Sequence, residues 1–176
     1  LKIFLGHFSD KISSYKSSSA KDCCYWVIIH GNQDSYMKIH KIQEDISSEV
    51  AKSFKDSIAI DTEATGLLIP ERDKLSLVQI CSEGGDVYII QPNRKNYKMP
   101  NLVSVLENEK IQKIGHFLRF DKSALEYFLK CKMKNIFCTK IASKICRTYT
   151  DAHGLKSLVQ EFCNKKLDKN QGSSDW

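Results

Sequence analysis

Residues 58–67 read Ile58-Ala59-Ile60-Asp61-Thr62-Glu63-Ala64-Thr65-Gly66-Leu67, an apolar run that ends in two carboxylates and a turn. A short apolar run bounded by turn residues is typical of a buried central strand. Side chains alternate across a strand, so Asp61 and Glu63 are expected on the same face. Two adjacent carboxylates repel each other unless they share a proton or hold a cation. The stretch therefore predicts either a site for a divalent metal with oxygen ligands or an acidic strand end with no function.

The turn after these carboxylates is predicted at Thr65-Gly66, where glycine can adopt a positive φ at little cost. Further strands are expected on either side of the turn, with helices between them. The resulting order is three successive strands, followed by helix, strand, helix, strand and helices. The three successive strands are expected to be antiparallel neighbours. This order predicts an α/β protein with a mixed sheet that carries helices on its faces. The expected strands are 57–63, 75–81, 86–91, 111–115 and 135–138, and the helices lie around 46–54, from 102, and at 119–129, 139–147 and 153–163.

The length of 176 residues fits one domain with an extension. Residues 1–36 contain a serine-rich stretch and no visible chemistry, so they are predicted to be an N-terminal extension. A short alternating strand at 37–40 is expected to open the ordered domain, 37–176. No apolar run approaches membrane-spanning length. The seven cysteines form no C-x-x-C pair, which favours reduced thiols in a cytoplasmic protein.

The net charge of +6 is unevenly distributed along the chain. Residues 110–176 hold 14 Lys and Arg against 6 Asp and Glu, whereas residues 1–109 hold 13 against 15. A basic half beside an acidic site suits a polyanion held over a metal, although many proteins are this basic for other reasons.

The helix expected over 139–147 is amphipathic, and two of its faces can be assigned from spacing. Its apolar face contains Ile141, Ala142, Ile145 and Cys146. The opposite face contains Lys140, Lys144 and Arg147, which could contact phosphates of a polyanion. The alternative is a solvated helix face with no ligand.

A further carboxylate, Asp121, follows the strand predicted at 111–115 and begins the next helix. A carboxylate in a first helical turn is favoured by the helix dipole and needs no function. Together with Asp61 and Glu63, however, it could supply a third oxygen ligand to one cleft. Two metal ions held there could position an attacking water and a leaving oxygen for phosphoryl chemistry.

Several motifs resemble those of the DEDD 3′–5′ exonucleases. Asp61 to Leu67 is similar to their first motif, and His116 to Asp121 is similar to their second. The segments 138–155 and 171–176 resemble the bacterial ribonuclease D branch, in a short form without extra C-terminal domains. The resemblance covers residues 37–176 and implies a ribonuclease H-like fold with a five-stranded mixed sheet flanked by helices.

The resemblance also implies two divalent ions, Mg²⁺ or Mn²⁺, and removal of nucleotides from RNA 3′ ends, as in tRNA maturation or RNA turnover. Asp61 would bind both metals, Glu63 one of them and Asp121 the other. Residues that would lie against the terminal nucleotide are Thr62, Leu67, His116 and Phe117. From the residues alone, core packing is the more frequent explanation for Leu67 and the better one for at least one of Phe117 and Phe120, whereas a structural role explains His116 equally well. With an RNA substrate, Lys140, Lys144 and Arg147 would contact phosphates of the single strand.

One departure from the family pattern concerns a third motif, with a tyrosine and a fourth aspartate, which is not reached before Trp176. The domain is therefore expected to be truncated before that motif. This leaves open a catalytically impaired nucleic-acid-binding module of the same fold. A haloacid-dehalogenase-like phosphatase is disfavoured because Glu63 stands where that family has aspartate. A DNA-directed exonuclease is disfavoured only by the ribonuclease D-like segments.

Overall fold

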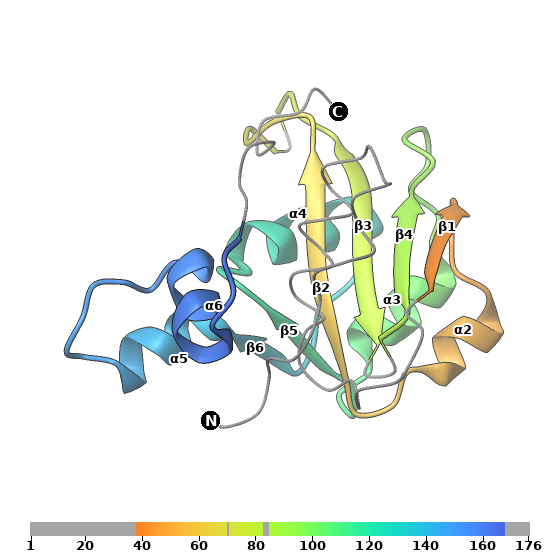
Figure 1. Ribbon diagram of the computed structural model, residues 1–176. Coiled ribbons are helices and arrows are strands. Elements are labelled where there is room, and N and C mark those ends of the chain that lie inside the picture. Colours follow the sequence, from red (N-terminus) through yellow and green to blue (C-terminus); the bar gives the residue numbers. More distant parts are fainter. Residues whose placement is uncertain (1–37, 70, 83–84, 168–176) are drawn as a thin grey trace.

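A six-stranded mixed sheet forms the centre of the molecule in the computed structural model, which describes residues 38–69, 71–82 and 85–167. The expectations for residues 1–36 and 171–176 lie outside this part of the chain. The strand order is β1-β4-β3-β2-β5-β6 (Figure 1). The strands are β1 (Ile39–Gln43), β2 (Ser57–Ala64), β3 (Leu75–Ser82), β4 (Val87–Gln91), β5 (Gln112–Gly115) and β6 (Ile136–Cys138).

The predicted mixed α/β sheet is confirmed, with six strands where five were expected. The sixth strand is β1, which overlaps the short strand expected at 37–40 and pairs in parallel with β4 at one edge. β2, β3 and β4 are antiparallel neighbours, as their short connections predicted. β5 runs parallel to β2, and β6 runs parallel to β5. The strand that carries Asp61 and Glu63 therefore lies in the interior of the sheet.

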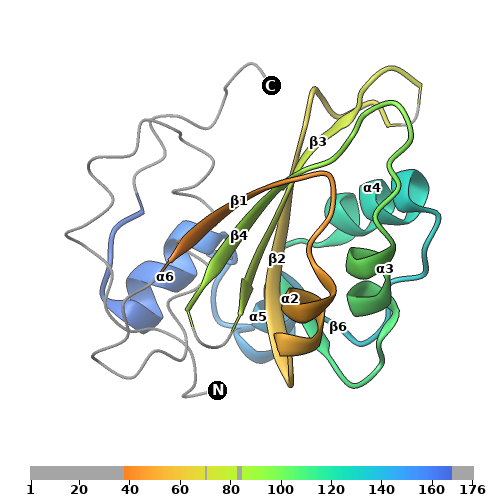
Figure 2. The same ribbon diagram turned by 90° about the vertical axis from the view of Figure 1, so that its right-hand side faces the viewer.

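Helices cover the sheet as the apolar periodicity predicts. Figure 2 shows α2, α3 and α4 on one side of the sheet and α6 on the other. The helices are α2 (Ser48–Ser53), α3 (Pro100–Glu107), α4 (Arg119–Leu129), α5 (Thr139–Cys146) and α6 (Leu155–Cys163). α4 has the bounds and the buried face expected from the sequence, namely Ala124, Leu125, Phe128 and Leu129. These side chains pack into a core with Ile58, Ile60, Val78, Ile80 and Ile90 of the sheet.

α3 is held by charged side chains at both ends. The Asp45 carboxylate accepts hydrogen bonds from the backbone N–H groups of Asn101 (2.8 Å) and Leu102 (3.1 Å). At the other end, the fully buried Lys113 donates from Nζ to three carbonyl oxygens, those of Val105 (3.4 Å), Asn108 (2.7 Å) and Ile111 (2.7 Å). An anion at the helix start and a cation at its end both match the helix dipole.

None of the helices in the described part of the chain is long and apolar enough to cross a membrane. The cysteines in that part, at positions 81, 131, 138, 146 and 163, are free thiols.

Candidate active site

The alternation along β2 places Asp61 and Glu63 on one face of the sheet and Thr62 on the other. Ile58, Ile60 and Thr62 are buried, whereas the two carboxylates are half-buried. In the antiparallel pairing with β3, Asp61 lies opposite Gln79, and the register shifts at Glu63/Ala64. Cross-strand partners share a face, so Gln79 belongs to the carboxylate side. The strand thus delivers both carboxylates at the point where its pairing becomes irregular.

Asp121 reaches β2 from the first turn of α4. β5 accompanies β2 only as far as the pair Ala59–Ile114, so within the described part of the chain no strand lies beside β2 on that side beyond Ala59. There the buried Asp121 Oδ1 accepts hydrogen bonds from Thr62 N (2.9 Å) and Thr62 Oγ1 (2.7 Å). Burial raises the pKa of Asp121, and the hydrogen bonds from Thr62 act in the opposite direction. Thr62 itself is buried, and its hydroxyl holds Asp121. The substrate contact predicted for Thr62 stays a prediction.

The three predicted metal ligands are thus linked through one residue. Asp61 and Glu63 flank Thr62 in the chain, and Thr62 binds Asp121. Within the ranges that the structure describes, no group of three or more His, Cys, Asp or Glu side chains is close enough to hold a metal ion. Carboxylate oxygens are the donors that Mg²⁺ and Mn²⁺ prefer. The buried Gln79 Oε1 on the same face has no hydrogen-bond partner among residues 38–69, 71–82 and 85–167. The donor set fits a hard divalent ion in kind, and the individual ligand roles stay predictions.

The turn after β2 requires Gly66 for a steric reason. Its φ is not in the left-handed region, so the conformational freedom expected from the sequence is not what is used. A Cβ on Gly66 would lie 2.3 Å from Asp73 Oδ2. That oxygen accepts a hydrogen bond from Leu68 N (2.7 Å), and the carboxylate also binds Arg72. The closed turn leaves Leu67 80% exposed, so core packing does not explain this side chain.

A second group of predicted substrate residues lies in the loop between β5 and α4. His116 Nδ1 is 3.0 Å from Thr139 Oγ1 at the start of α5. Phe117 has a φ of 62° and a side chain that is 53% exposed. Lys140 Nζ lies 4.0 Å from the centre of its ring, a cation–π contact. A strained aromatic residue held exposed beside a cation is common at functional sites, and it suits stacking with a base.

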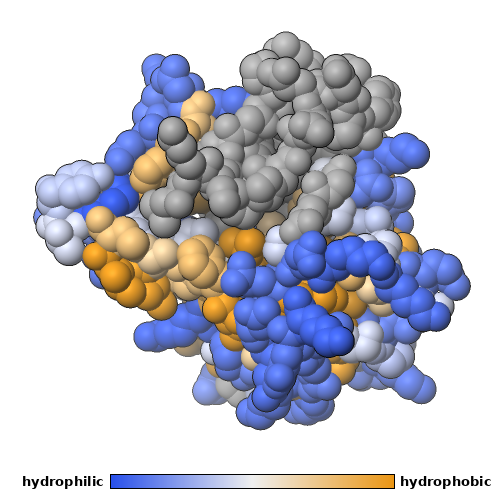
Figure 3. Space-filling model, turned by 90° about the horizontal axis from the view of Figure 1, so that it is seen from below, coloured by the Kyte–Doolittle hydropathy of each residue, from blue (hydrophilic) through white to orange (hydrophobic). Residues whose placement is uncertain are grey.

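The side of α5 that the sequence identifies as apolar lies at the protein surface. Ile141 and Ile145 are 58% and 71% exposed, and Cys146 is exposed, whereas Ser143 and Arg147 are buried. Hydrophobic surface is accordingly visible toward the left of Figure 3, on the side where α5 lies. The apolar side chains of Ile141, Ile145 and Cys146 thus lie at the surface and not against the core.

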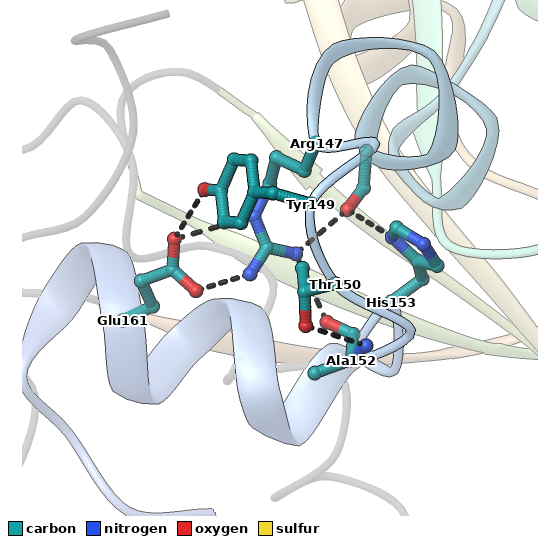
Figure 4. Close-up of polar contacts among 7 residues, drawn as sticks. Arg147, Tyr149, Thr150, Ala152, His153 and Glu161 are labelled. Atoms are coloured by element: carbon teal, nitrogen blue, oxygen red, sulfur yellow. Dashed lines mark hydrogen bonds and ion pairs between the residues drawn. The ribbon is translucent and has the colours of Figure 1, made fainter.

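Arg147 lies at the centre of a polar network between α5 and α6 (Figure 4). Its guanidinium binds both carboxylate oxygens of Glu161 and donates to Ser143 Oγ (2.9 Å) and Ala152 O (2.9 Å). Ser143 Oγ also lies 2.9 Å from His153 Nδ1. Arg147 is only 3% exposed, so it is not on a solvated face with Lys140 and Lys144. This geometry favours a structural role, and its predicted phosphate contact has no support from the structure.

Comparisons with known proteins identify the family of this chain. A family model described as a 3′–5′ exonuclease matches residues 36–176. Ribonuclease D of Bartonella henselae is 28% identical over 124 residues, which is 69% of this chain and 29% of that protein. The chain thus spans less than a third of the length of this curated relative.

Solved structures of Brucella melitensis NrnC are also similar. NrnC bound to pGG is 42% identical, with a TM-score of 0.72 over 80% of this chain and 67% of that one. NrnC with bound Mg²⁺ is 38% identical, with a TM-score of 0.70 over 80% of this chain and 69% of that one. With the first two motifs in place on β2 and α4, the chain belongs to the DEDD family of 3′–5′ exonucleases, as its sequence predicted.

Proposed function

We propose that this protein is a metal-dependent 3′–5′ exoribonuclease that hydrolyses phosphodiester bonds at RNA 3′ ends. The observation that carries the proposal is the link between three carboxylates through Thr62. Asp61 and Glu63 come from one strand, and their shared neighbour binds Asp121 by two hydrogen bonds. A strand end and a helix start that both carry acidic side chains are thereby joined through one residue.

In this proposal Asp61, Glu63 and Asp121 would hold two divalent ions, Mg²⁺ or Mn²⁺. Such ions supply an activated water and neutralise charge on the scissile phosphate. Thr62 fixes the orientation of Asp121 through its backbone N–H and its hydroxyl. Burial raises the pKa of this carboxylate, and the hydrogen bonds from Thr62 lower it and so oppose that effect.

The terminal nucleotide would lie between the turn after β2 and the loop after β5. Leu67 would pack against the last base, and the exposed ring of Phe117 would stack on a base. Lys140, over that ring, and the exposed Lys144 would contact phosphates, and His116 would bind a phosphate or ribose. The pGG bound to NrnC supports a short RNA as substrate, and tRNA precursors are a second, longer substrate class.

The alternative of a catalytically impaired binding module gains no support from the comparisons, because the matched family model and the curated relative are both named for nuclease activity. The family match also gives no support to a phosphatase. We further propose that residues 37–176 form the exonuclease domain. The cytoplasmic location remains a prediction from the free thiols.

The test is a digest of 5′-labelled single-stranded RNA with Mg²⁺ or Mn²⁺. A dinucleotide, a 20-nucleotide RNA and a DNA of the same sequence would be compared. We expect products that shorten stepwise from the 3′ end, none in EDTA, and a loss of at least about 100-fold in rate for Asp61→Ala. The matched control is Asp56→Ala, which removes an exposed carboxylate just before β2, at the far end of that strand from Asp61. RNA binding without cleavage in any metal would contradict the proposal.

A further inference from the structure

Gln79 is a fully buried amide on the carboxylate face of the sheet. It lies on β3 directly opposite Asp61 and points to the same face. Its Nε2 donates a long hydrogen bond of 3.5 Å to Glu63 Oε1, diagonally across the two strands. The family motifs identified in the sequence do not include Gln79. The sequence places it only within the strand expected at 75–81.

The carbonyl oxygen of the Gln79 amide, Oε1, is expected to destabilise the fold. Gln79 Oε1 is buried and has no hydrogen-bond partner among the residues that the structure describes. A buried carbonyl oxygen without a partner carries a desolvation penalty that an unbranched apolar side chain of the same length avoids. The reverse amide orientation would place Oε1 against the Glu63 carboxylate, so the donating orientation is the favourable one. The advantage of glutamine over an apolar residue at this position therefore lies in the hydrogen bond that Nε2 donates to Glu63.

We infer that Gln79 is a positioning residue for the metal site: its amide holds the Glu63 carboxylate in the orientation that binds a divalent ion. The inference rests on the proposed function and adds a residue to it. Glu63 is the last residue of β2 before the register of the β2–β3 pairing shifts, so regular backbone pairing constrains its direction from one side only. Partners that orient a metal-binding side chain commonly change metal affinity 10- to 100-fold when they are removed.

The experiment measures metal binding and stability separately, with the full chain. The melting temperature is recorded in EDTA and then across a titration of Mn²⁺, and the midpoint of the metal-induced shift is determined. For Gln79→Met we expect a melting temperature in EDTA equal to or above that of the wild type. We also expect a Mn²⁺ midpoint raised about 10- to 100-fold, with a matching loss in kcat/KM.

Two further variants separate positioning from packing. Gln79→Asn keeps an amide that is too short to reach Glu63, and it is expected to raise the Mn²⁺ midpoint as well. Val78→Ala perturbs the other face of the same strand, and it should lower the melting temperature in EDTA while leaving the midpoint unchanged. If either Gln79 variant folds and keeps the wild-type midpoint, the inference is overturned while the proposed function stands. A wild-type protein with no response to Mn²⁺ or Mg²⁺ would overturn both.

Discussion

Thr62 donates both its backbone N–H and its hydroxyl to one oxygen of Asp121, at 2.9 and 2.7 Å. The contact arises because β5 leaves β2 after Ala59, so that the first turn of α4 takes the place of a strand at this edge. The residue between the two strand carboxylates thereby fixes the third. A substitution at Thr62 should consequently affect both the fold and the metal site.

Thr62→Val removes the hydroxyl donor while it keeps the shape and the backbone N–H. Asp121 is buried, so the loss of a hydrogen bond to its carboxylate should lower the free energy of unfolding by about 1–3 kcal/mol. Urea unfolding in EDTA at pH 7 measures this change. Thr62→Ser retains the hydroxyl and should retain most of the stability. Equal stability of the wild type and Thr62→Val would show that the hydroxyl contributes little.

Asp121→Asn should separate stability from metal binding. The Asn oxygen can still accept both hydrogen bonds from Thr62, and the variant no longer buries a carboxylate whose pKa burial raises. We expect a melting temperature in EDTA no lower than that of the wild type, a lost stabilisation by Mg²⁺ or Mn²⁺, and at least about 100-fold lower nuclease activity. Calorimetric melts with and without metal measure the first two effects. A variant with the full metal response would remove Asp121 from the ligand set.

Lys144→Ala should weaken RNA binding without changing stability. Lys144 is exposed on α5, one turn beyond the lysine that lies over Phe117. Loss of one phosphate contact to a single strand should reduce the slope of log K against log salt by about 0.7. Fluorescence anisotropy at several salt concentrations, in Ca²⁺ or EDTA to suppress cleavage, measures the slope. The control is Lys110→Ala, which changes a lysine before β5, at the far end of that strand from His116, and should leave the slope unchanged. An unchanged slope for Lys144→Ala would show that Lys144 does not contact the RNA.

Arg147→Lys is expected to lower stability without changing RNA binding. A lysine cannot replace the planar fork that binds Glu161, Ser143 and Ala152 together. The buried position should make the variant less stable by about 1–3 kcal/mol, measured by urea unfolding. The salt slope for RNA should stay that of the wild type. Arg119→Lys, an exposed arginine at the start of α4, is the matched control and should have no effect on stability.

The sequence predicted the parts of the site that depend on local pattern. The apolar run before Asp61 allows one placement, a buried strand with both carboxylates on one face, and the structure has it. The periodicity of α4 likewise specified its bounds and its buried face. Both elements pack along their whole length on the central core, so local pattern and tertiary burial agree.

Local pattern failed where tertiary contacts decide. Periodicity shows which residues of α5 share a face, but not which side chains are covered, and the network around Arg147 buries Ser143 and Arg147 while Lys144 stays exposed. The requirement for Gly66 comes from Asp73, which approaches through a turn whose geometry the sequence does not reveal. The pairing of Gln79 with Glu63 depends on strand register, which no single stretch of sequence specifies.

The buried Lys113 should make stability depend on pH above neutrality. Burial lowers its pKa from the ordinary value of 10.5 to about 8. Between these values the unfolded chain binds more protons than the folded one, so the free energy of unfolding rises with pH, by at most about 1.4 kcal/mol per pH unit. Below pH 8 both states are protonated, and the contribution is constant.

Unfolding in urea from pH 7 to 10.5 should therefore show a rise in the free energy of unfolding for the wild type relative to Lys113→Met. Lys110→Met, which removes an exposed lysine, should follow the wild type. Parallel curves for the wild type and Lys113→Met would mean that Lys113 stays protonated in the fold, its charge stabilised by the three carbonyl oxygens at the end of α3.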